Sequence, residues 1–199
     1  MAAAREAKRL LRKDIKRRLM QLSDTEKKRQ SQIVTNKLLE HPGYIQSQRI
    51  SVYLSMPDQE VHTEGILQDI FRQNKLCYVP QYIGSVMNML RVNSMKDYES
   101  LPKTKWNIKQ PADDDKDRED ALLTGGLDLI IIPGLGFSKF GDRLGRGKGY
   151  YDKYQTKCQQ LTGKKPITIA LAFNEQMCND VPTTDLDITI DYVLFCDAV

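Results

Sequence analysis

The chain has 199 residues, a mass of 22.9 kDa, 40% hydrophobic and 28% charged residues, and a net charge of +4. These values are typical of one soluble globular domain, and no apolar run approaches the roughly 20 residues that a membrane-spanning helix needs. Four scattered cysteines and only two histidines argue against a disulfide framework and a histidine-based metal centre. We therefore expect a single cytoplasmic domain over residues 1–199, with reduced thiols and without a secretory signal.

The N-terminal segment is the most basic part of the chain. Leu11, Ile15 and Leu19 recur at helical spacing, which predicts a helix over residues 3–21. Eight Lys and Arg residues lie in the same segment, against two acids. Such a cluster is usually a solvated helix face, although a cationic stretch also suits an anionic partner.

The next segments alternate between helical and strand-like patterns. Ser23 followed by Glu26 forms a capping-box pattern that starts a second helix, and Pro42-Gly43 is expected to stop it. Further along, Thr63 is expected to cap the start of a helix that ends near Gln73. Strands are predicted over residues 49–54, 76–79 and 87–92.

Residues 93–126 show no clear period and contain two prolines. Their most charged stretch is residues 113–120, in which all eight side chains are acidic or basic. A run of this kind is usually solvated, so we expect a mobile acidic loop over about residues 111–121 and consider metal binding there the less favoured interpretation.

The second half of the chain carries the most buried-looking strand. Residues 127–132 are almost continuously apolar, as in strands that are covered on both faces. A glycine-rich loop follows, then a helix over about residues 147–160 and strands over residues 167–173 and 191–195. Strands that alternate with helices predict a three-layer α/β/α fold with a mostly parallel sheet in a single domain.

The glycine-rich loop over residues 134–149 has the composition of an anion site. It contains six glycines, which let backbone N–H groups approach a ligand, and in its second half Arg143, Arg146 and Lys148 add cationic donors suited to phosphate oxygens. Ligands of open α/β sheets bind beyond the carboxyl ends of strands, which is where this loop is expected. A purely structural loop is the alternative, and neither the Walker nor the dinucleotide glycine pattern fits.

Asp152 follows Lys148 by four residues, which places both on one face of the predicted helix. A carboxylate beside bound phosphates is a natural ligand for Mg²⁺, which prefers hard oxygen donors. A simple ion pair between Asp152 and Lys148 explains the spacing equally well. Both interpretations stay open at the level of spacing alone.

Several motifs together resemble the 5-formyltetrahydrofolate cyclo-ligase family. The clearest is Pro133-Gly-Leu-Gly-Phe137, followed by Gly141 and by the run Arg-Leu-Gly-Arg-Gly-Lys-Gly-Tyr-Tyr-Asp from Arg143 to Asp152. Residues 101–108, 125–129 and 171–173 are similar to the eukaryotic branch of that family. The resemblance covers most of the chain.

This resemblance implies an ATP-dependent ligase. In the family, ATP activates the formyl oxygen of 5-formyltetrahydrofolate, and N10 then closes the ring to give 5,10-methenyltetrahydrofolate, ADP and phosphate. ATP is a co-substrate and Mg²⁺ the cofactor that the resemblance implies. It also implies a cytoplasmic monomer that binds neither nucleic acid nor a membrane.

The resemblance assigns roles to individual positions. The implied ATP contacts are Lys8, Arg12, Arg143, Leu144, Gly145, Arg146, Gly147, Lys148, Gly149, Tyr150 and Tyr151. The implied folate contacts are Leu54, Glu60, Arg146, Gly147, Lys148, Gly149 and Tyr150. Arg146, Lys148 and Tyr150 are the implied catalytic residues, and Asp152 and Asp187 the implied Mg²⁺ ligands.

Some of these assignments have neighbours that fit nearly as well. Asp58 competes with Glu60 because the loop that contains them departs from the family pattern, and Asp185 and Asp191 compete with Asp187. Trp106, the only tryptophan, could stack on an aromatic ligand or pack locally.

Two other functions compete with the ligase hypothesis. A nucleic-acid-binding module would use the basic N-terminal helix, but the chain lacks the interleaved aromatic residues of a single-strand binder. A phosphosugar or coenzyme A enzyme on a similar sheet would explain the anion loop, although not Glu60, Lys8 or Arg12.

Overall fold

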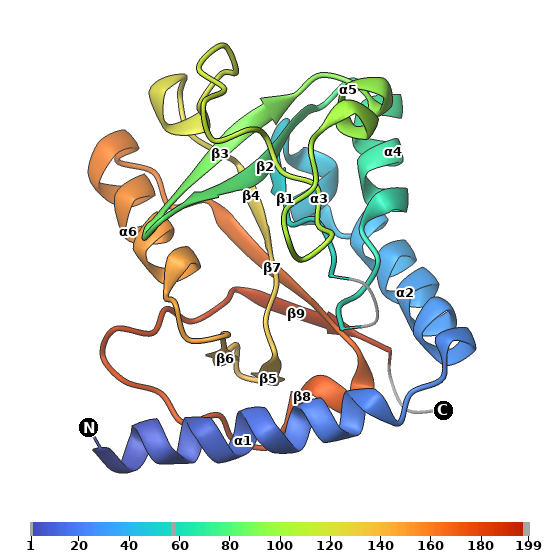
Figure 1. Cartoon of the computed structure of the whole chain (residues 1–199), viewed down its shortest axis with the longest axis vertical. Helices are drawn as coiled ribbons and strands as arrows, with labels where there is room; N and C mark the ends of the chain where they lie inside the picture. Colours follow the sequence, from blue (N-terminus) through green and yellow to red (C-terminus); the bar gives the residue numbers. More distant parts are fainter. Residues whose placement is uncertain (1, 57–58, 197–199) are drawn as a thin grey trace.

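The computed structural model describes residues 2–56 and 59–196. At its centre is a six-stranded sheet in the order β3-β2-β1-β4-β7-β9 (Figure 1). All neighbouring strands pair in parallel except β2 and β3, which confirms the mostly parallel sheet. The strands are β1 (Arg49–Val52), β2 (Leu76–Ile83), β3 (Val86–Val92), β4 (Leu129–Ile132), β7 (Ile167–Ala172) and β9 (Tyr192–Phe195).

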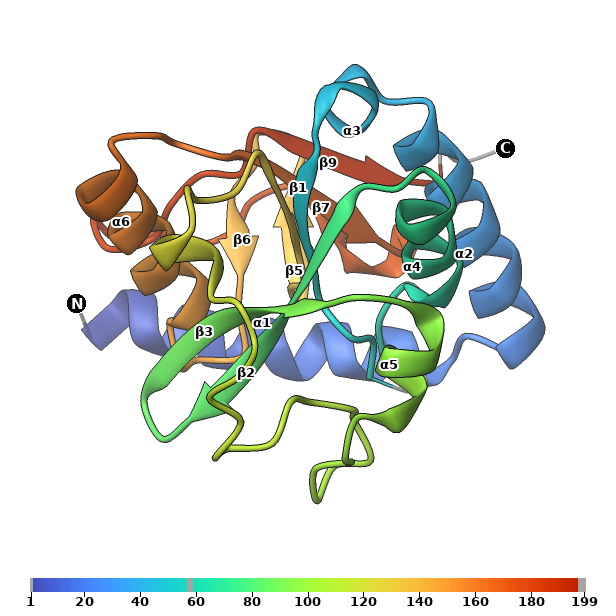
Figure 2. The same ribbon diagram turned by 90° about the horizontal axis from the view of Figure 1, so that it is seen from above.

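Apolar side chains cover both faces of this sheet. In β4, Leu129 and Ile131 belong to one core cluster and Ile130 and Ile132 to the other, because successive side chains of a strand point to opposite faces. Figure 2 shows the helices of the two outer layers on either side of the sheet, which confirms the three-layer α/β/α fold. The first layer includes α2 (Asp24–Leu39) and α4 (Glu64–Arg72), and the second contains α6 (Tyr150–Thr162).

The basic helix α1 (Ala2–Met20) agrees with the prediction for residues 3–21 and lies across the carboxyl-end edge of the sheet (Figure 1). Ile15 and Leu19 are its buried residues, at 0% and 3% exposure. Beside it lies a small second sheet in the order β6-β5-β8, which the sequence analysis did not predict. Its strands are β5 (Gly136–Ser138), β6 (Arg143–Leu144) and β8 (Met177–Cys178).

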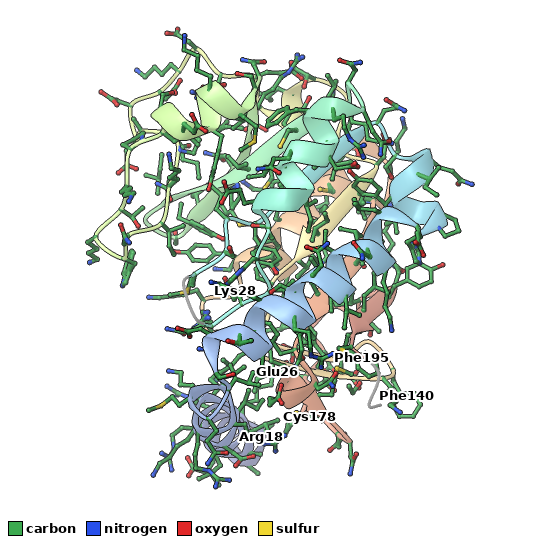
Figure 3. All side chains as sticks on the ribbon, turned by 90° about the vertical axis from the view of Figure 1, so that its right-hand side faces the viewer. Arg18, Glu26, Lys28, Phe140, Cys178 and Phe195 are labelled. Atoms are coloured by element: carbon green, nitrogen blue, oxygen red, sulfur yellow. The ribbon has the colours of Figure 1, made fainter. Side chains whose placement is uncertain are left out.

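The small sheet connects α1 to the rest of the fold. Arg18 Nη1 of α1 donates to Met177 O at 3.4 Å, and Figure 3 shows Arg18 close to Cys178. The turn between β5 and β6 extends outward, so that Phe140 lies at the periphery and is 81% exposed. Part of the expected glycine-rich loop is therefore a short hairpin that α1 covers.

Three helix boundaries differ in detail from the predictions. Ser23 Oγ accepts from Glu26 N at 3.2 Å, as predicted, but only this half of the capping box is present. Pro42 does not simply stop a helix, because it starts the short helix α3 (Pro42–Gln46). Thr63 precedes α4 as predicted but makes no side-chain capping bond. No helix in the described part of the chain has the length and apolarity needed to cross a bilayer.

The charged segment before β4 is less solvated than expected at its C-terminal end. Arg118 forms ion pairs with Asp97 and Asp115, at 2.6 and 2.7 Å, and all three side chains are less than a quarter exposed. Glu119 accepts a hydrogen bond from Tyr78 Oη at 2.5 Å. The expectation of a solvated run is wrong here, while the mobility of residues 111–121 stays a prediction. The segment also contains α5 (Met95–Ser100) and η1 (Ala121–Leu123).

Candidate active site

A cavity of about 1280 Å³ lies at the carboxyl ends of the parallel strands. Its walls come from α1, the segment after β1, strand β2, the loop after α5 and the loop that leads into α6. This volume exceeds the roughly 300–1,000 Å³ of an ordinary small-molecule site, so it has room for two ligands. The implied site residues that line it are Lys8, Arg12, Leu54, Glu60, Arg143, Gly145, Arg146, Gly147, Lys148, Gly149, Tyr150, Tyr151, Asp152 and Asp187.

Leu144 is the implied ligand contact that the structure places elsewhere. It neighbours Arg143 in β6, and successive side chains of a strand point in opposite directions. Arg143 therefore lines the cavity, while Leu144 is fully buried in the core cluster beside α1. We retain no role for the Leu144 side chain in ligand binding.

The loop before α6 differs from the prediction in one consequential way. Helix α6 begins at Tyr150, with Gly149 as its N-cap, and not at residue 147. Lys148 therefore precedes the helix, and the argument that Lys148 and Asp152 share a helical face is wrong. Asp152 Oδ2 instead accepts from Arg143 Nη2 at 2.7 Å.

Two cations of α1 reach this loop region. Lys8 Nζ lies 2.5 Å from Asp187 Oδ2, and Arg12 Nε donates to Gly145 O at 2.9 Å. Their spacing of four residues puts both on the same face of α1, as expected. Together with Arg143, Arg146 and Lys148 they give one end of the cavity a concentration of positive charge suited to phosphates.

Asp152 and Asp187 are the carboxylates at this cationic end. Asp187 also accepts from Thr184 N and Oγ1, at 2.7 and 2.8 Å. Burial alone would raise the pKa of Asp187, but hydrogen bonds from Lys8 and Thr184 hold this pKa below its ordinary value. Residues 2–56 and 59–196 contain no cluster of three or more His, Cys, Asp or Glu side chains that could hold a metal by themselves. Two carboxylates fit Mg²⁺, which commonly takes one or two protein ligands and completes its shell with waters and substrate phosphates.

The competing acids are separated from this cavity. Asp191 accepts from Thr168 N and Oγ1, at 2.9 and 2.7 Å, and so ties the start of β9 to β7. Asp185 is exposed, and only Asp187 of these three acids lines the cavity. Placement therefore favours Asp187 as the second carboxylate.

Glu60 lines the same cavity and is 6% exposed. Its Oε2 accepts from Met56 N at 2.9 Å and its Oε1 from Arg146 Nη2 at 3.1 Å. Burial raises the pKa of Glu60 above its ordinary value, although Arg146 and the Met56 amide each oppose that shift. Leu54 also lines the cavity, whereas Asp58, the competing acid, lies outside the described residues.

Three tyrosines form an aromatic wall. The rings of Tyr82 and Tyr150 lie 4.9 Å apart, and Tyr150 Oη donates to Gly84 O at 2.7 Å. Tyr151 Oη lies 3.4 Å from Tyr82 Oη. Burial raises the pKa of Tyr151 well above its ordinary value, so it stays a neutral phenol near pH 7.

Trp106 lies on the rim of the cavity. It is 63% exposed and lines the cavity, with Lys105 Nζ 4.5 Å from its ring centroid. This exposure does not support the local packing role and leaves the indole face accessible to a flat ligand.

Sequence reasoning missed some cavity residues. Tyr82 was missed because β2 was predicted to end near residue 79, and pairing it with β3 around Gly84 would have extended it. Gln110, which accepts from Tyr82 N at 3.1 Å and so holds the loop after α5 against β2, carries no local signal. Thr184 likewise becomes visible only through its contact with Asp187.

Comparison with known proteins gives consistent matches over nearly the whole chain. The sequence profile of the 5-formyltetrahydrofolate cyclo-ligase family matches residues 4–196. A 5-formyltetrahydrofolate cyclo-ligase from Mus musculus is 52% identical over 194 residues, which cover 96% of this chain and 95% of that protein. A probable 5-formyltetrahydrofolate cyclo-ligase from Caenorhabditis elegans is 35% identical, with coverage of 98% and 95%. The solved structure of Aquifex aeolicus 5,10-methenyltetrahydrofolate synthetase matches with a TM-score of 0.76 at 26% identity, covering 94% of this chain and 88% of that one.

Proposed function

Because the chain belongs to the 5-formyltetrahydrofolate cyclo-ligase family, we propose that it is an enzyme that converts 5-formyltetrahydrofolate into 5,10-methenyltetrahydrofolate with ATP and Mg²⁺. The observation that carries this proposal is one cavity that is lined both by a cluster of cations and by a buried carboxylate. A cluster of cations suits the phosphates of ATP, and a buried carboxylate suits the N–H donors of a pterin. The volume is sufficient for both ligands.

The proposed reaction has two steps. The formyl oxygen attacks the γ-phosphorus of ATP, and the bond to the β,γ-bridging oxygen breaks, releasing ADP. N10 then attacks the formyl carbon and loses its proton, and the former formyl oxygen leaves with the phosphate. Phosphoryl transfer requires positioning and charge neutralisation more than a covalent side chain, which agrees with the donors that line the cavity.

The cationic end would hold ATP. Lys8 and Arg12 would contact it from α1, and Arg143 from the floor of the cavity. The backbone of Gly145, Gly147 and Gly149, with the first residues of α6, would approach the phosphates closely because this segment carries little side-chain bulk. Tyr150 and Tyr151 would complete this wall.

Asp152 and Asp187 would hold Mg²⁺ together with the phosphate oxygens. The ion, when bound, would neutralise charge that develops on the transferred phosphoryl group. In the ligand-free protein, Arg143 and Lys8 neutralise these two carboxylates. The site therefore pairs each carboxylate, which suits a metal ion, with a cation, which suits the phosphates.

Leu54 and Glu60 would contact the folate, with Gly147, Lys148, Gly149 and Tyr150 bordering it. Arg146, Lys148 and Tyr150 are the proposed catalytic residues because all three line the cavity that would hold both ligands. Removal of one such donor from a developing charge typically lowers kcat by about 10²–10³.

The direct test uses the purified protein with 5-formyltetrahydrofolate, Mg²⁺ and ATP. We expect the methenyl absorbance to rise together with release of one phosphate per product. Arg146→Ala should lower kcat by about 10²-fold, by analogy with loss of one charge-stabilising donor, while the chain stays folded. Folded protein that gives no product with fresh substrate would overturn the proposal.

We propose that residues 1–199 form one cyclo-ligase domain that acts as a cytoplasmic monomer without nucleic acid or a membrane. An Arabidopsis thaliana relative that is 33% identical is described as mitochondrial, so location should be tested by cell fractionation. Lys8 and Arg12 face the cavity, which favours the ligase over a nucleic-acid module that would need them outside.

A further inference from the structure

Arg146 is the only proposed ATP-binding cation within the described residues that also contacts the proposed folate carboxylate. Its Nη2 donates to Glu60 Oε1 and its Nη1 to Gln59 Oε1, both at 3.1 Å. The side chain of Arg146 is 33% exposed, against 7% for Glu60. The buried Glu60 therefore forms its ion pair with an arginine that solvent, or a ligand, can reach.

The chain around Arg146 allows it to change partner. Gly147 has φ of +105°, and the nearest atom to a Cβ built there would be Arg12 Nη2, 3.9 Å away. The backbone at Gly147 is therefore not closely packed, and within the described residues the Arg146 guanidinium donates to the side chains of Gln59 and Glu60. Few contacts have to break for the Arg146 side chain to leave Glu60 and turn toward an anionic ligand in the cavity.

We infer that Arg146 is shared between the two ligands and couples their binding: ATP draws it away from Glu60, and the carboxylate then accepts the N–H donors of the folate. The inference rests on the proposed function and extends it to the order of events at the same site. A triphosphate carries several negative charges and competes well for an arginine that a single carboxylate holds at 3.1 Å.

The coupling is positive because both ligands need the same contact to break. A buried carboxylate cannot lose its counter-charge without replacement, so either ligand that binds alone must supply the whole free energy of separating Arg146 from Glu60. The second ligand finds the pair already open. By thermodynamic linkage, ATP and folate must then strengthen each other's binding by the same factor.

Calorimetric titration tests this without turnover. The Kd of 5-formyltetrahydrofolate is measured with and without saturating Mg²⁺ and the β,γ-imido analogue of ATP, and the analogue is then titrated with and without the folate. We expect each ligand to lower the Kd of the other by an equal factor of about 5–150, the usual range of such couplings. Equal folate affinity with and without the analogue, in protein that forms product, overturns the inference and leaves the proposed function intact.

Two variants and a control identify the residue responsible. Glu60→Gln removes the ion pair, so the analogue should bind it several-fold more tightly than it binds wild type; unchanged or weaker binding overturns the inference. Arg146→Ala should reduce the coupling factor to about 1. Lys148→Ala is the matched control, since Lys148 is a cation of the same loop. This variant should bind the analogue more weakly than wild type but keep the same coupling factor. Wild-type protein that binds neither ligand and gives no product would instead reject the proposed function itself.

Discussion

Gly141 is the residue at which the fold leaves least room. Its φ is +90°, and a Cβ built on it would lie 2.2 Å from the carbonyl oxygen of Ile190. Ile190 N donates to Gly141 O at 2.9 Å, so the β5–β6 turn and the segment before β9 are held together at this point. This contact positions one side of the loop that leads to the cationic end of the cavity.

Gly141→Ala should therefore destabilise the protein more than an ordinary substitution at positive φ. Gly163→Ala is the matched control, because Gly163 has φ of +67° with no atom within 4 Å of a built Cβ. The loss of unfolding free energy in this variant should therefore reflect backbone strain alone, about 1–2 kcal/mol. Urea unfolding of both variants would measure the difference. Equal losses of unfolding free energy would show that the Ile190 carbonyl moves aside without cost.

At the scale of single side chains, the chemistry was easier to predict than the partners. The cations and glycines of the phosphate loop could be identified because their residue types follow from what phosphates need. The partner of Asp152 could not, because the error of three residues in the start of α6 removed Lys148 from the helix. Arg143 took its place through the β5–β6 hairpin, whose two-residue strand gives no periodic signal.

Among the elements, the segment between β3 and β4 is held by ion pairs as well as by apolar packing. Glu119 accepts bonds from Tyr78 and Arg91 and lies 3.3 Å from Arg49 Nη2. Although burial alone would raise it, these donors together with Thr124 lower the pKa of Glu119 to about 2, from an ordinary value of 4.5. This carboxylate therefore ties η1 and the end of β3 to β1 and β2.

Glu119 should make the fold acid-sensitive in a defined range. Since its pKa is lower in the folded than in the unfolded chain, its contribution is complete above about pH 4.5 and is lost as the pH falls toward 2. Glu119→Gln should lower the free energy of unfolding at pH 7 by roughly 1.5–3 kcal/mol and flatten its pH dependence below 4.5. Denaturant titrations from pH 2 to 7 would measure both effects. Glu99→Gln, at an exposed position, is the control and should change neither.

Elements marked by an apolar run or by helical spacing were predicted, including the short strands β1 and β9, whereas several other short elements were not. The buried strand β4 and the helix α1 follow directly from apolar runs and helical spacing. The helix α5 and the strands β5, β6 and β8 have two to six residues, too few for a period to emerge. They form because neighbouring elements supply hydrogen-bond partners for their backbone N–H and C=O groups, as when Leu135 N donates to Leu144 O at 2.8 Å.

At the scale of the whole molecule, the C-terminal half of α1 packs into the core, and its N-terminal half lines the candidate site. Ile15 and Leu19 are buried, whereas Lys8 and Arg12 line the cavity. Deletion of residues 1–9 should therefore leave the free energy of unfolding within about 1 kcal/mol of wild type, as for surface changes, while ATP binding weakens about tenfold or more. Thermal melts and calorimetry would measure these quantities.

Lys13→Ala provides the comparison for that deletion. Lys13 is an exposed cation of the same helix that does not line the cavity, so its loss should leave ATP affinity unchanged. If Lys13→Ala weakened ATP binding as much as the deletion does, the lost affinity would come from the overall positive charge of α1 and not from the Lys8 contact. Large destabilisation by the deletion would show that the N-terminal half of α1 carries more of the core than Ile15 and Leu19 indicate.

The layout of the molecule was predictable, while its longest contacts were not. Alternating strands and helices predict a parallel sheet, and a parallel sheet predicts a site at its carboxyl edge, which is where the cavity lies. The pairing of Lys8 with Asp187 links residues 179 positions apart, and no local spacing contains that information. Only the resemblance of the chain to a known family suggested that both belong to one site.

That same pair bears on how the protein is made. Asp187 is translated 179 residues after Lys8, and strand β9 follows it. At about 5–20 residues per second, α1 waits on the order of 10 s or more for its partner. A nascent chain therefore lacks the Lys8–Asp187 contact, and with it part of the cavity wall, until residue 187 has been synthesised.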